Sequence, residues 1–275
     1  MTNVLSGHVA LVTGGRRGIG AAIAKRLAAA GVSVVLAAQT AEDDGLQQTM
    51  DAITAAGGRV ASTIFDLADG EARAGAVERA AEAFGPIDIL VNNAATNNYA
   101  PPSAMDLAFR RLMFEVNTHG PIDLVQQTLP HMKAQGWGRI INITSASREQ
   151  AELPYSPSHG AIVVYGASKL ALERFTTGLA AELSGTGITT NSYYPTAVCV
   201  TGANSEAALT ALRKNPQIAE SVEMMAEAAM LLMQSGMTGL ALPSREVLFL
   251  MQSPLHALDG TTVIGDANTL ADLGE

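Results

Sequence analysis

Tyr165 and Lys169 have the spacing and the chemistry of an acid/base pair. Residues four apart lie on one face of an α-helix, so the phenol and the ammonium would be neighbours. A phenol, with a pKa near 10, is a poor base at pH 7. A cation about 4 Å away favours the phenolate by roughly 4 kcal/mol, an upper guide to a pKa lowering of about two to three units. The pair predicts proton transfer by Tyr165, although this pattern alone is common by chance.

A glycine-rich stretch near the N-terminus has the composition of a phosphate-binding loop. It reads Thr13-Gly14-Gly15-Arg16-Arg17-Gly18-Ile19-Gly20 and lies between an apolar run and a helical pattern. Glycines permit a tight turn, and the backbone N–H groups of the following helix can bind a pyrophosphate. The stretch therefore predicts a dinucleotide site.

The expected ribose site has basic residues and lacks a carboxylate. An acidic residue that holds the ribose 2′-hydroxyl is expected about 20 positions beyond the loop. Counting from Gly20 leads to Ala38-Gln39-Thr40, which contains none. Arg16 and Arg17 carry guanidiniums, which suit bidentate phosphate binding. These features favour NADP over NAD, and solvent exposure of the arginines is the alternative.

Short apolar runs alternate with longer helical patterns up to residue 195. The runs are His8–Val12, Ser33–Ala37, Val60–Ile64, Ile87–Val91, Arg139–Thr144 and Ile188–Tyr194. Helical spacing marks Ile19–Ala30, Gly70–Ala83 and Val164–Leu183 between them. Apolar runs of this length are typical of strands buried on both faces of a parallel sheet. The alternation predicts an α/β fold, a Rossmann-like doubly wound sheet with helices on both faces.

We expect one domain over residues 1–275, because no linker or change of composition precedes residue 195. Beyond it the pattern is less regular, and residues 196–218 are assigned to a substrate loop and 244–275 to a C-terminal extension. In this part we expect a helix at Glu220–Gln234, a strand at Thr238–Pro243, a helix at Arg245–Gln252 and no confident pattern from Ser253 to Glu275.

Composition excludes several classes of protein. Hydrophobic residues make up 48% of the chain, enough for a sizeable core, and the net charge of −9 argues against a nucleic-acid partner. The lone cysteine, Cys199, excludes an intramolecular disulfide, and the five histidines lack metal-ligand spacing. Because of that histidine spacing, no bound metal is expected. No run of about 18 apolar residues and no leader occurs, so no association with a membrane is expected. These features predict a cytoplasmic protein.

Five motifs occur in order at the ends of successive elements, and together they resemble the classical short-chain dehydrogenase/reductase family. They are Thr13–Gly20, Asn92-Asn93-Ala94-Ala95, Asn117, Ile141–Ser145 and Tyr165–Lys169. The resemblance covers roughly residues 5–243. It implies an NAD(P)-dependent oxidoreductase that acts on a small-molecule alcohol or ketone. It also implies a homo-oligomer, a tetramer or a dimer, joined through helices near Asp106–Leu129 and Gly166–Leu183.

The resemblance implies a role for each matching residue. Tyr165 would be the acid/base, Lys169 would bind the nicotinamide ribose and lower the tyrosine pKa, and Ser145 would bind the substrate oxygen. Asn117 would hold a proton-relay water, and Asp66 would contact the adenine. Further cofactor contacts are implied at Gly14, Arg16, Arg17, Gly18, Ile19, Gln39, Leu67, Asn93, Ala94, Ala95, Pro195, Thr196 and Val198.

The sequence departs from the family pattern at three places. Ala95 and Thr196 each replace a glycine of the family motifs. Ser145 precedes Tyr165 by 20 positions, a wider separation than the family usually has. The additional residues lie in Arg148–Val163, which we expect to fold over the substrate site as a lid. Because of the altered spacing, Ser147 is the alternative for the serine role.

Two other functions remain open at this point. The same fold could serve as a non-catalytic cofactor-binding sensor or scaffold. A related lyase or epimerase could use the same tyrosine and lysine. The complete set of Asn117, Ser145, Tyr165 and Lys169 favours the oxidoreductase, because a sensor has no chemical need for it.

Overall fold

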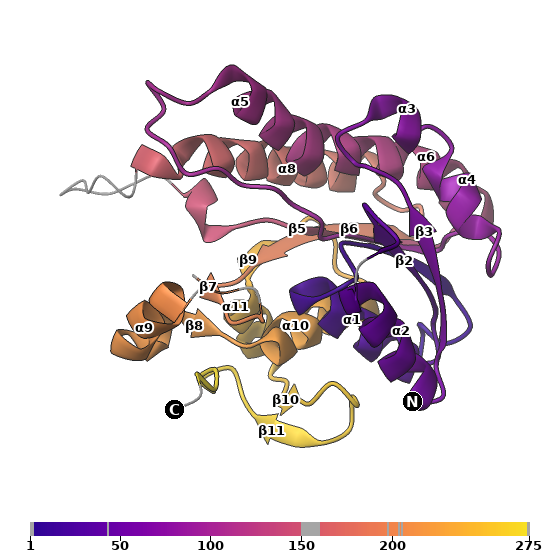
Figure 1. Ribbon diagram of the computed structural model, residues 1–275. Coiled ribbons are helices and arrows are strands. Elements are labelled where there is room, and N and C mark those ends of the chain that lie inside the picture. The colour runs from indigo at the N-terminus through magenta and orange to yellow at the C-terminus, as the bar shows by residue number, and fades with distance from the viewer. Residues whose placement is uncertain are drawn as a thin grey trace.

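A seven-stranded parallel sheet forms the centre of the protein (Figure 1). The computed structural model describes residues 3–42, 44–149, 160–196, 198–202, 204 and 206–273. In spatial order the strands are β3 (Arg59–Ile64), β2 (Ser33–Ala38), β1 (Val9–Thr13), β4 (Ile89–Asn92), β5 (Gly138–Ile143), β6 (Ile188–Tyr194) and β9 (Ala241–Pro243). Strand order reverses between β1 and β4, which leaves a crevice at the carboxyl ends of the strands. The predicted fold class is confirmed.

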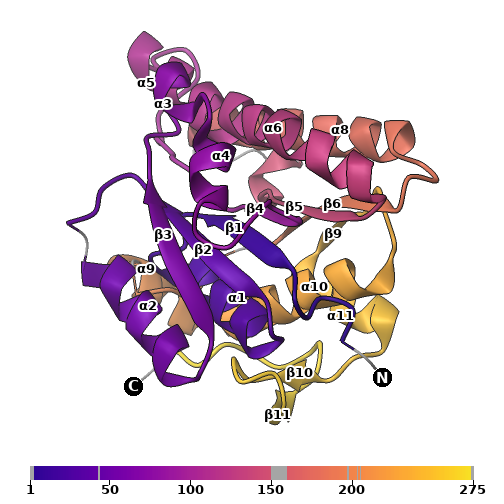
Figure 2. The same cartoon turned by 90° about the vertical axis from the view of Figure 1, so that its right-hand side faces the viewer.

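Helices cover both faces of the sheet (Figures 1 and 2). One face carries α1 (Gly18–Ala29), α2 (Asp44–Ala55), α9 (Glu206–Lys214), α10 (Val222–Ser235) and α11 (Ser244–Met251). The other face carries α3 (Gly70–Arg73), α4 (Ala76–Ala81), α5 (Leu107–Phe114), α6 (Gly120–Gln135) and α8 (Val163–Glu182). Separate hydrophobic clusters fill the two layers, so the strands between them are buried on both sides, as their unbroken apolar runs predict.

The helix predicted over Gly70–Ala83 is wrong as one element. It is divided into α3 and α4 by Gly75, whose φ of 66° lies in the left-handed region that favours glycine. The Arg73 side chain turns inward at the break, where it pairs with Glu115 at 2.5 Å and Asp123 at 2.8 Å. A buried guanidinium requires such partners, so tertiary contacts set this break.

Several short elements lack a signal in the sequence. They are the π-helix η1 (Glu115–His119), the 3₁₀ turns η2 (Ala146–Arg148) and η3 (Pro216–Ile218), and the paired strands β7 (Val198–Cys199) with β8 (Ala219–Glu220) and β10 (Leu255–His256) with β11 (Val263–Gly265). The last pair gives structure to a tail for which no pattern was expected. The domain boundaries assigned from sequence stay a prediction. Within the described ranges, no helix is long and apolar enough to cross a bilayer.

A buried ion pair attaches the C-terminal tail to the helices below the sheet. The Arg26 guanidinium lies 2.6 Å from Glu227, and both side chains are almost fully buried. Arg26 also donates a hydrogen bond to the carbonyl oxygen of Ala257 at 3.2 Å. Since α1 carries Arg26 and α10 carries Glu227, the pair joins both helices to the tail.

Replacing Arg26 by methionine should therefore lower the free energy of unfolding by about 3 kcal/mol, because Glu227 keeps a buried charge that, in the described part of the chain, only His256, 3.2 Å away, still contacts. Urea unfolding measures this loss. Lys133→Met is the matched control, since the Lys133–Glu182 pair is solvent-exposed and its loss should cost less than about 1 kcal/mol. Equal losses in the two variants would contradict the role assigned to Arg26.

Candidate active site

The glycine-rich loop is held in place by the neighbouring strand end. The Asn93 side-chain amide donates to the carbonyl oxygens of Thr13 at 2.9 Å and Gly14 at 3.2 Å. A Cβ atom at Gly20 would overlap the carbonyl oxygen of Gly14, so only glycine lets α1 begin this close to the loop. Gly14 and Gly18 have φ values of 65° and 58°. The loop thus needs glycines for both its turns and its contacts.

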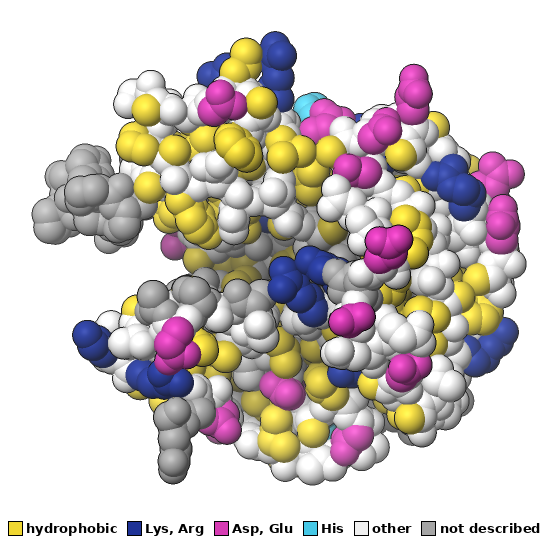
Figure 3. All heavy atoms as spheres, in the orientation of Figure 1, with side chains coloured by type: hydrophobic (Ala, Val, Ile, Leu, Met, Phe, Trp, Pro, Cys, Tyr) yellow, Lys and Arg dark blue, Asp and Glu magenta, His cyan; other side chains and the backbone are white. Residues whose placement is uncertain are grey.

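A cavity of about 650 Å³ lies between this loop and the carboxyl ends of β2, β3 and β4. Its walls include these residues predicted to contact the cofactor: Gly14, Arg16, Arg17, Gly18, Ile19, Gln39, Asp66, Leu67, Asn93, Ala94 and Ala95. Thr201 also lines it and lies next to Gly18, a position that no sequence signal indicated. Figure 3 shows a deep hollow in the molecule with basic side chains at its inner end. The cavity, its glycines and its arginines fit a dinucleotide phosphate.

The polar contacts near the end of β2 differ from those of a ribose-binding carboxylate. Ala38 and Gln39 both line the cavity. The Gln39 amide donates to the Asp66 carboxylate at 2.9 Å, so the carboxylate in the cavity wall is bonded to a neighbouring side chain. Arg16 is half-buried and Arg17 is exposed beside the same cavity. The solvent-exposed alternative thus describes Arg17 better than Arg16.

The four predicted catalytic residues come from three elements. Ser145 caps η2 two residues beyond the end of β5, Tyr165 and Lys169 lie on α8, and Asn117 lies in η1. The Ser145 hydroxyl is hydrogen-bonded to the Tyr165 phenol. Lys169 Nζ donates to the Ile143 carbonyl oxygen at 2.9 Å and lies 6.0 Å from the centre of the Tyr165 ring. The structure therefore brings Ser145, Tyr165 and Lys169 together.

Asn117 is fully buried and ties three segments together. Its side chain accepts from Thr96 N at 2.9 Å and donates to Thr96 O at 2.9 Å and to Ser168 Oγ at 3.0 Å. Ser168 is the residue before Lys169. The π-helical turn places Asn117 between β4 and α8, and such turns are frequent at functional sites.

The predicted lowering of the Tyr165 pKa by Lys169 is wrong in this structure. Burial raises the pKa of Tyr165 to about 12, and the hydrogen bond from Ser145 only partly opposes this rise. Burial also lowers the pKa of Lys169 to about 8, because its ammonium is surrounded by protein and meets a carbonyl oxygen instead of a carboxylate. The prediction from the sequence considered only the attraction between the Tyr165 phenolate and the Lys169 ammonium, and it left out the effect of removing both groups from water.

Ser147 supports Ser145. The Ser147 hydroxyl donates to Ser145 Oγ at 2.9 Å, and its backbone N–H lies 3.2 Å from the same oxygen. Since Ser145 is the residue bonded to Tyr165, the geometry favours it over Ser147 for binding a substrate oxygen.

The turn after β6 has an anchor that sequence reasoning missed. The backbone N–H of Thr196 donates to the Glu220 carboxylate at 3.0 Å, and Glu220 is fully buried. Arg245 pairs with the same carboxylate at 3.1 Å. This contact fixes the Pro195-Thr196 turn, and Val198 follows it in β7 with a partly exposed side chain.

Part of the expected lid lies outside the described residues. Arg148, Glu149 and residues 160–163 are described, whereas 150–159 are not. The proposal that this segment covers the substrate stays a prediction.

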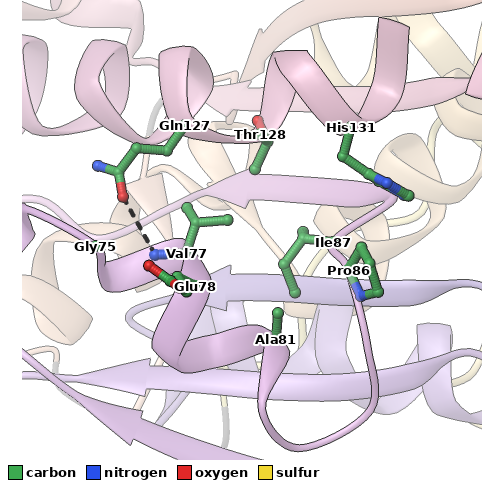
Figure 4. Close-up of a pocket in the computed structure, with 9 residues that line it drawn as sticks. All are labelled: Gly75, Val77, Glu78, Ala81, Pro86, Ile87, Gln127, Thr128 and His131. Atoms are coloured by element: carbon green, nitrogen blue, oxygen red, sulfur yellow. Dashed lines mark hydrogen bonds between the residues drawn. The ribbon is translucent and has the colours of Figure 1, made fainter. Parts of the chain in front are cut away.

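A second cavity, of about 300 Å³, contains none of the predicted site residues (Figure 4). It lies between α4 and α6, where Gln127 Oε1 accepts from the Val77 N–H at 3.3 Å. Within the described part of the chain, no group of three or more His, Cys, Asp or Glu side chains could hold a metal ion.

Comparison with known proteins identifies the family. The family description "short chain dehydrogenase" matches residues 8–211. The chain belongs to the short-chain dehydrogenase family. The predicted resemblance is thus confirmed, and with it the class of NAD(P)-dependent oxidoreductases.

Curated short-chain dehydrogenase relatives match about 70% of the chain. The ketoacyl reductase HetN of Nostoc sp. is 34% identical over 198 residues, which are 72% of this chain and 66% of that protein. Gluconate 5-dehydrogenase of Gluconobacter oxydans is 34% identical over 191 residues, which are 70% of this chain and 71% of that one.

A solved structure extends the similarity over most of the fold. The 3-oxoacyl (acyl-carrier-protein) reductase of Agrobacterium tumefaciens, with NADP bound, superposes with a TM-score of 0.78 at 30% identity. The match covers 88% of this chain and 94% of that one. A nicotinamide dinucleotide therefore binds to this architecture in a short-chain dehydrogenase relative.

The lowered pKa of Lys169 predicts how the free energy of unfolding depends on pH. Between about pH 8 and 10.5 the unfolded chain holds the Lys169 proton and the folded chain does not, so stability rises with pH. By pH 10 the Lys169 contribution is about 2 to 3 kcal/mol. Burial raises the pKa values of Cys199 and Tyr193, which act in the opposite direction at alkaline pH, so the contribution is read as the difference between the protein and Lys169→Met. Urea unfolding across this range should show the free energy of unfolding of the protein rising with pH relative to that of Lys169→Met. The same rise in Lys169→Met would contradict it, and Lys133→Met should keep it.

Proposed function

We propose that the protein transfers a hydride between NADP and an alcohol or ketone, with Tyr165 as the acid/base. The observation that supports this most directly is the Ser145–Tyr165 hydrogen bond, with Lys169 beside it on α8. Two hydroxyl groups directed at each other can both bind one substrate oxygen. This arrangement favours the oxidoreductase over a cofactor-binding scaffold.

The residues of the chain divide the reaction between them. A bound nicotinamide supplies or accepts the hydride. In the direction of reduction the Tyr165 hydroxyl donates its proton to the carbonyl oxygen, and Ser145 donates a second hydrogen bond that holds this oxygen. In oxidation the Tyr165 oxygen takes the proton of the alcohol. Lys169 would bind the nicotinamide ribose.

A preference for NADP is supported by two observations. Arg16 and Arg17 lie at the cavity, and Ala38 stands where a ribose-binding carboxylate is expected. Relatives of known structure carry NADP in their sites. The substrate is proposed only as a carbonyl compound or its secondary alcohol, since the relatives include a ketoacyl reductase and a gluconate 5-dehydrogenase.

Assembly into a tetramer or dimer and a cytoplasmic location are also proposed. Exposed apolar side chains on α5 and α8, at Leu107, Phe109 and Leu170, support an interface between copies. Leu172 and Leu179 are buried in the chain's own core, so the apolar excess on α8 is smaller than its sequence indicates. A reducing location is consistent with the lone cysteine.

Tyr165→Phe removes the proton donor and keeps the ring, so turnover should fall by at least about 10²-fold. The rate is measured by the oxidation of NADPH on a panel of a β-keto ester, a cyclic ketone and a keto sugar acid. Affinity for NADPH should change little. Tyr193→Phe is the matched control, because the Tyr193 hydroxyl bonds to Met225 O on the other face of the sheet. Retention of most turnover by Tyr165→Phe would reject this role.

Ala38→Asp should shift the cofactor preference toward NAD. A carboxylate at the end of β2 can accept from the ribose hydroxyls, and it repels a 2′-phosphate. The ratio of kcat/KM for NADPH and NADH should fall by at least about tenfold, equivalent to about 1.4 kcal/mol. Ala38→Asn, of the same size without the charge, is the control. A parent protein that already prefers NADH would contradict the proposal.

A further inference from the structure

Arg148 joins three segments of the chain beside the catalytic residues. Its guanidinium donates to Glu173 Oε1 at 2.6 Å and to the Tyr194 hydroxyl at 2.6 Å, and it lies 4.4 Å above the Tyr194 ring. The Tyr194 hydroxyl in turn donates to Glu149 Oε1 at 3.1 Å. The Glu173 side chain is 9% exposed and that of Arg148 is 18% exposed. This is a largely buried ion pair, and the mechanism above does not use it.

Each of the three segments carries part of the site. Arg148 lies three residues after Ser145 and ends η2. Glu173 lies on α8 four residues beyond Lys169, on the same face of the helix. Tyr194 is the last residue of β6 and directly precedes the Pro195 turn. The guanidinium therefore ties the serine segment to the helix of Tyr165 and to the end of β6.

Glu173 contacts the chain on both sides of Ser145. It pairs with Arg148 on one side, and it is a hydrogen-bond partner of the Thr144 side chain on the other. Burial raises the pKa of the Glu173 carboxyl, and both contacts oppose this rise. Ser145 is thus bracketed by two residues that bind one carboxylate.

The η2 turn needs such an anchor. A 3₁₀ turn of three residues has few hydrogen bonds of its own and takes its position from its surroundings. Its backbone rests directly on α8, since a Cβ atom at Gly166 would overlap Ser147 O. Gly166 permits this approach, and Arg148 supplies the attraction that maintains it.

We propose that Arg148, through Glu173, is a positioning residue that holds Ser145 in hydrogen-bonding reach of Tyr165. The proposal deepens the proposed function and rests on it. Arg148 touches no reacting atom in this arrangement, so it acts through Ser145. Its loss should lower kcat and leave the affinity for NADPH almost unchanged, because the glycine-rich loop and the residues after β2, β3 and β4 that line the cavity have no contact with Arg148 among the described bonds.

The main test is a double-mutant cycle on kcat, with NADPH and the carbonyl compound of the panel that the parent reduces fastest. Arg148→Met and Ser145→Ala should each lower kcat by at least about tenfold. In the Ser145→Ala background, Arg148→Met should have less than about a threefold further effect, since residues that act as a unit are not additive. Independent, multiplying effects would overturn the proposal.

A second measurement does not depend on turnover. Hydrogen–deuterium exchange of the amides of residues 144–149 should become faster in Arg148→Met, while exchange in α1 stays the same. Arg26→Met is the matched control, because it breaks another buried Arg–Glu pair of 2.6 Å but lies away from Ser145. It should lower thermal stability and leave both kcat and exchange at 144–149 unchanged. Unchanged exchange in Arg148→Met overturns the proposal even if no substrate is found.

Conservative variants separate position from folding. Arg148→Lys keeps the charge near Glu173 but cannot also reach Tyr194, so its kcat should lie between those of the parent and Arg148→Met. Arg148→Met/Glu173→Gln removes both charges and should recover thermal stability without recovering kcat. If kcat follows thermal stability through this series, Arg148 is only structural. If Ser145→Ala itself keeps full turnover, the proposed function fails, whereas normal kcat in Arg148→Met alone refutes only this inference.

Discussion

The reversal of strand order between β1 and β4 is the constraint on which the site depends. Connections leave these two neighbouring strands toward opposite faces of the sheet, with α1 below and the helices near α6 above (Figure 2). Neither connection covers the carboxyl ends of β1 and β4, so a crevice remains between them. The glycine-rich loop, Asn93 and Asp66 lie at this crevice because each comes within two residues of the carboxyl end of a strand.

The side chains that meet at the carboxyl ends of the strands include polar groups, and burying these groups is unfavourable unless they are hydrogen-bonded. Lys169, Asn117 and Glu220 are almost or fully buried, and each has a hydrogen-bond partner that compensates for lost water. Desolvation shifts the pKa of Tyr165 upward and that of Lys169 downward. Both groups are thereby made neutral more easily, which suits a site where a proton must move.

Much of the fold and of the site could be predicted from the chain itself. Runs such as Ser33–Ala38 are apolar without alternation, which requires a strand with helices on both faces. The Tyr165–Lys169 spacing and the glycines of the loop are local patterns, so they specify local geometry. The family resemblance assigned both the loop residues and Asp66 to the cofactor, and they line one cavity because the carboxyl ends of parallel strands share one edge of the sheet.

Tertiary structure alone decided the remainder. No local pattern relates Arg148 to Glu173 or Thr196 to Glu220, since these partners are 25 and 24 positions apart and meet only when helix and strand are packed. The break at Gly75 follows from the inward turn of Arg73 toward Glu115 and Asp123. Burial raises the pKa of Tyr165, and the spacing of residues in the sequence does not predict how much water the folded site excludes. The sequence determined the kind of site and the strand ends that carry it, and packing determined its electrostatics and the contacts that hold it in place.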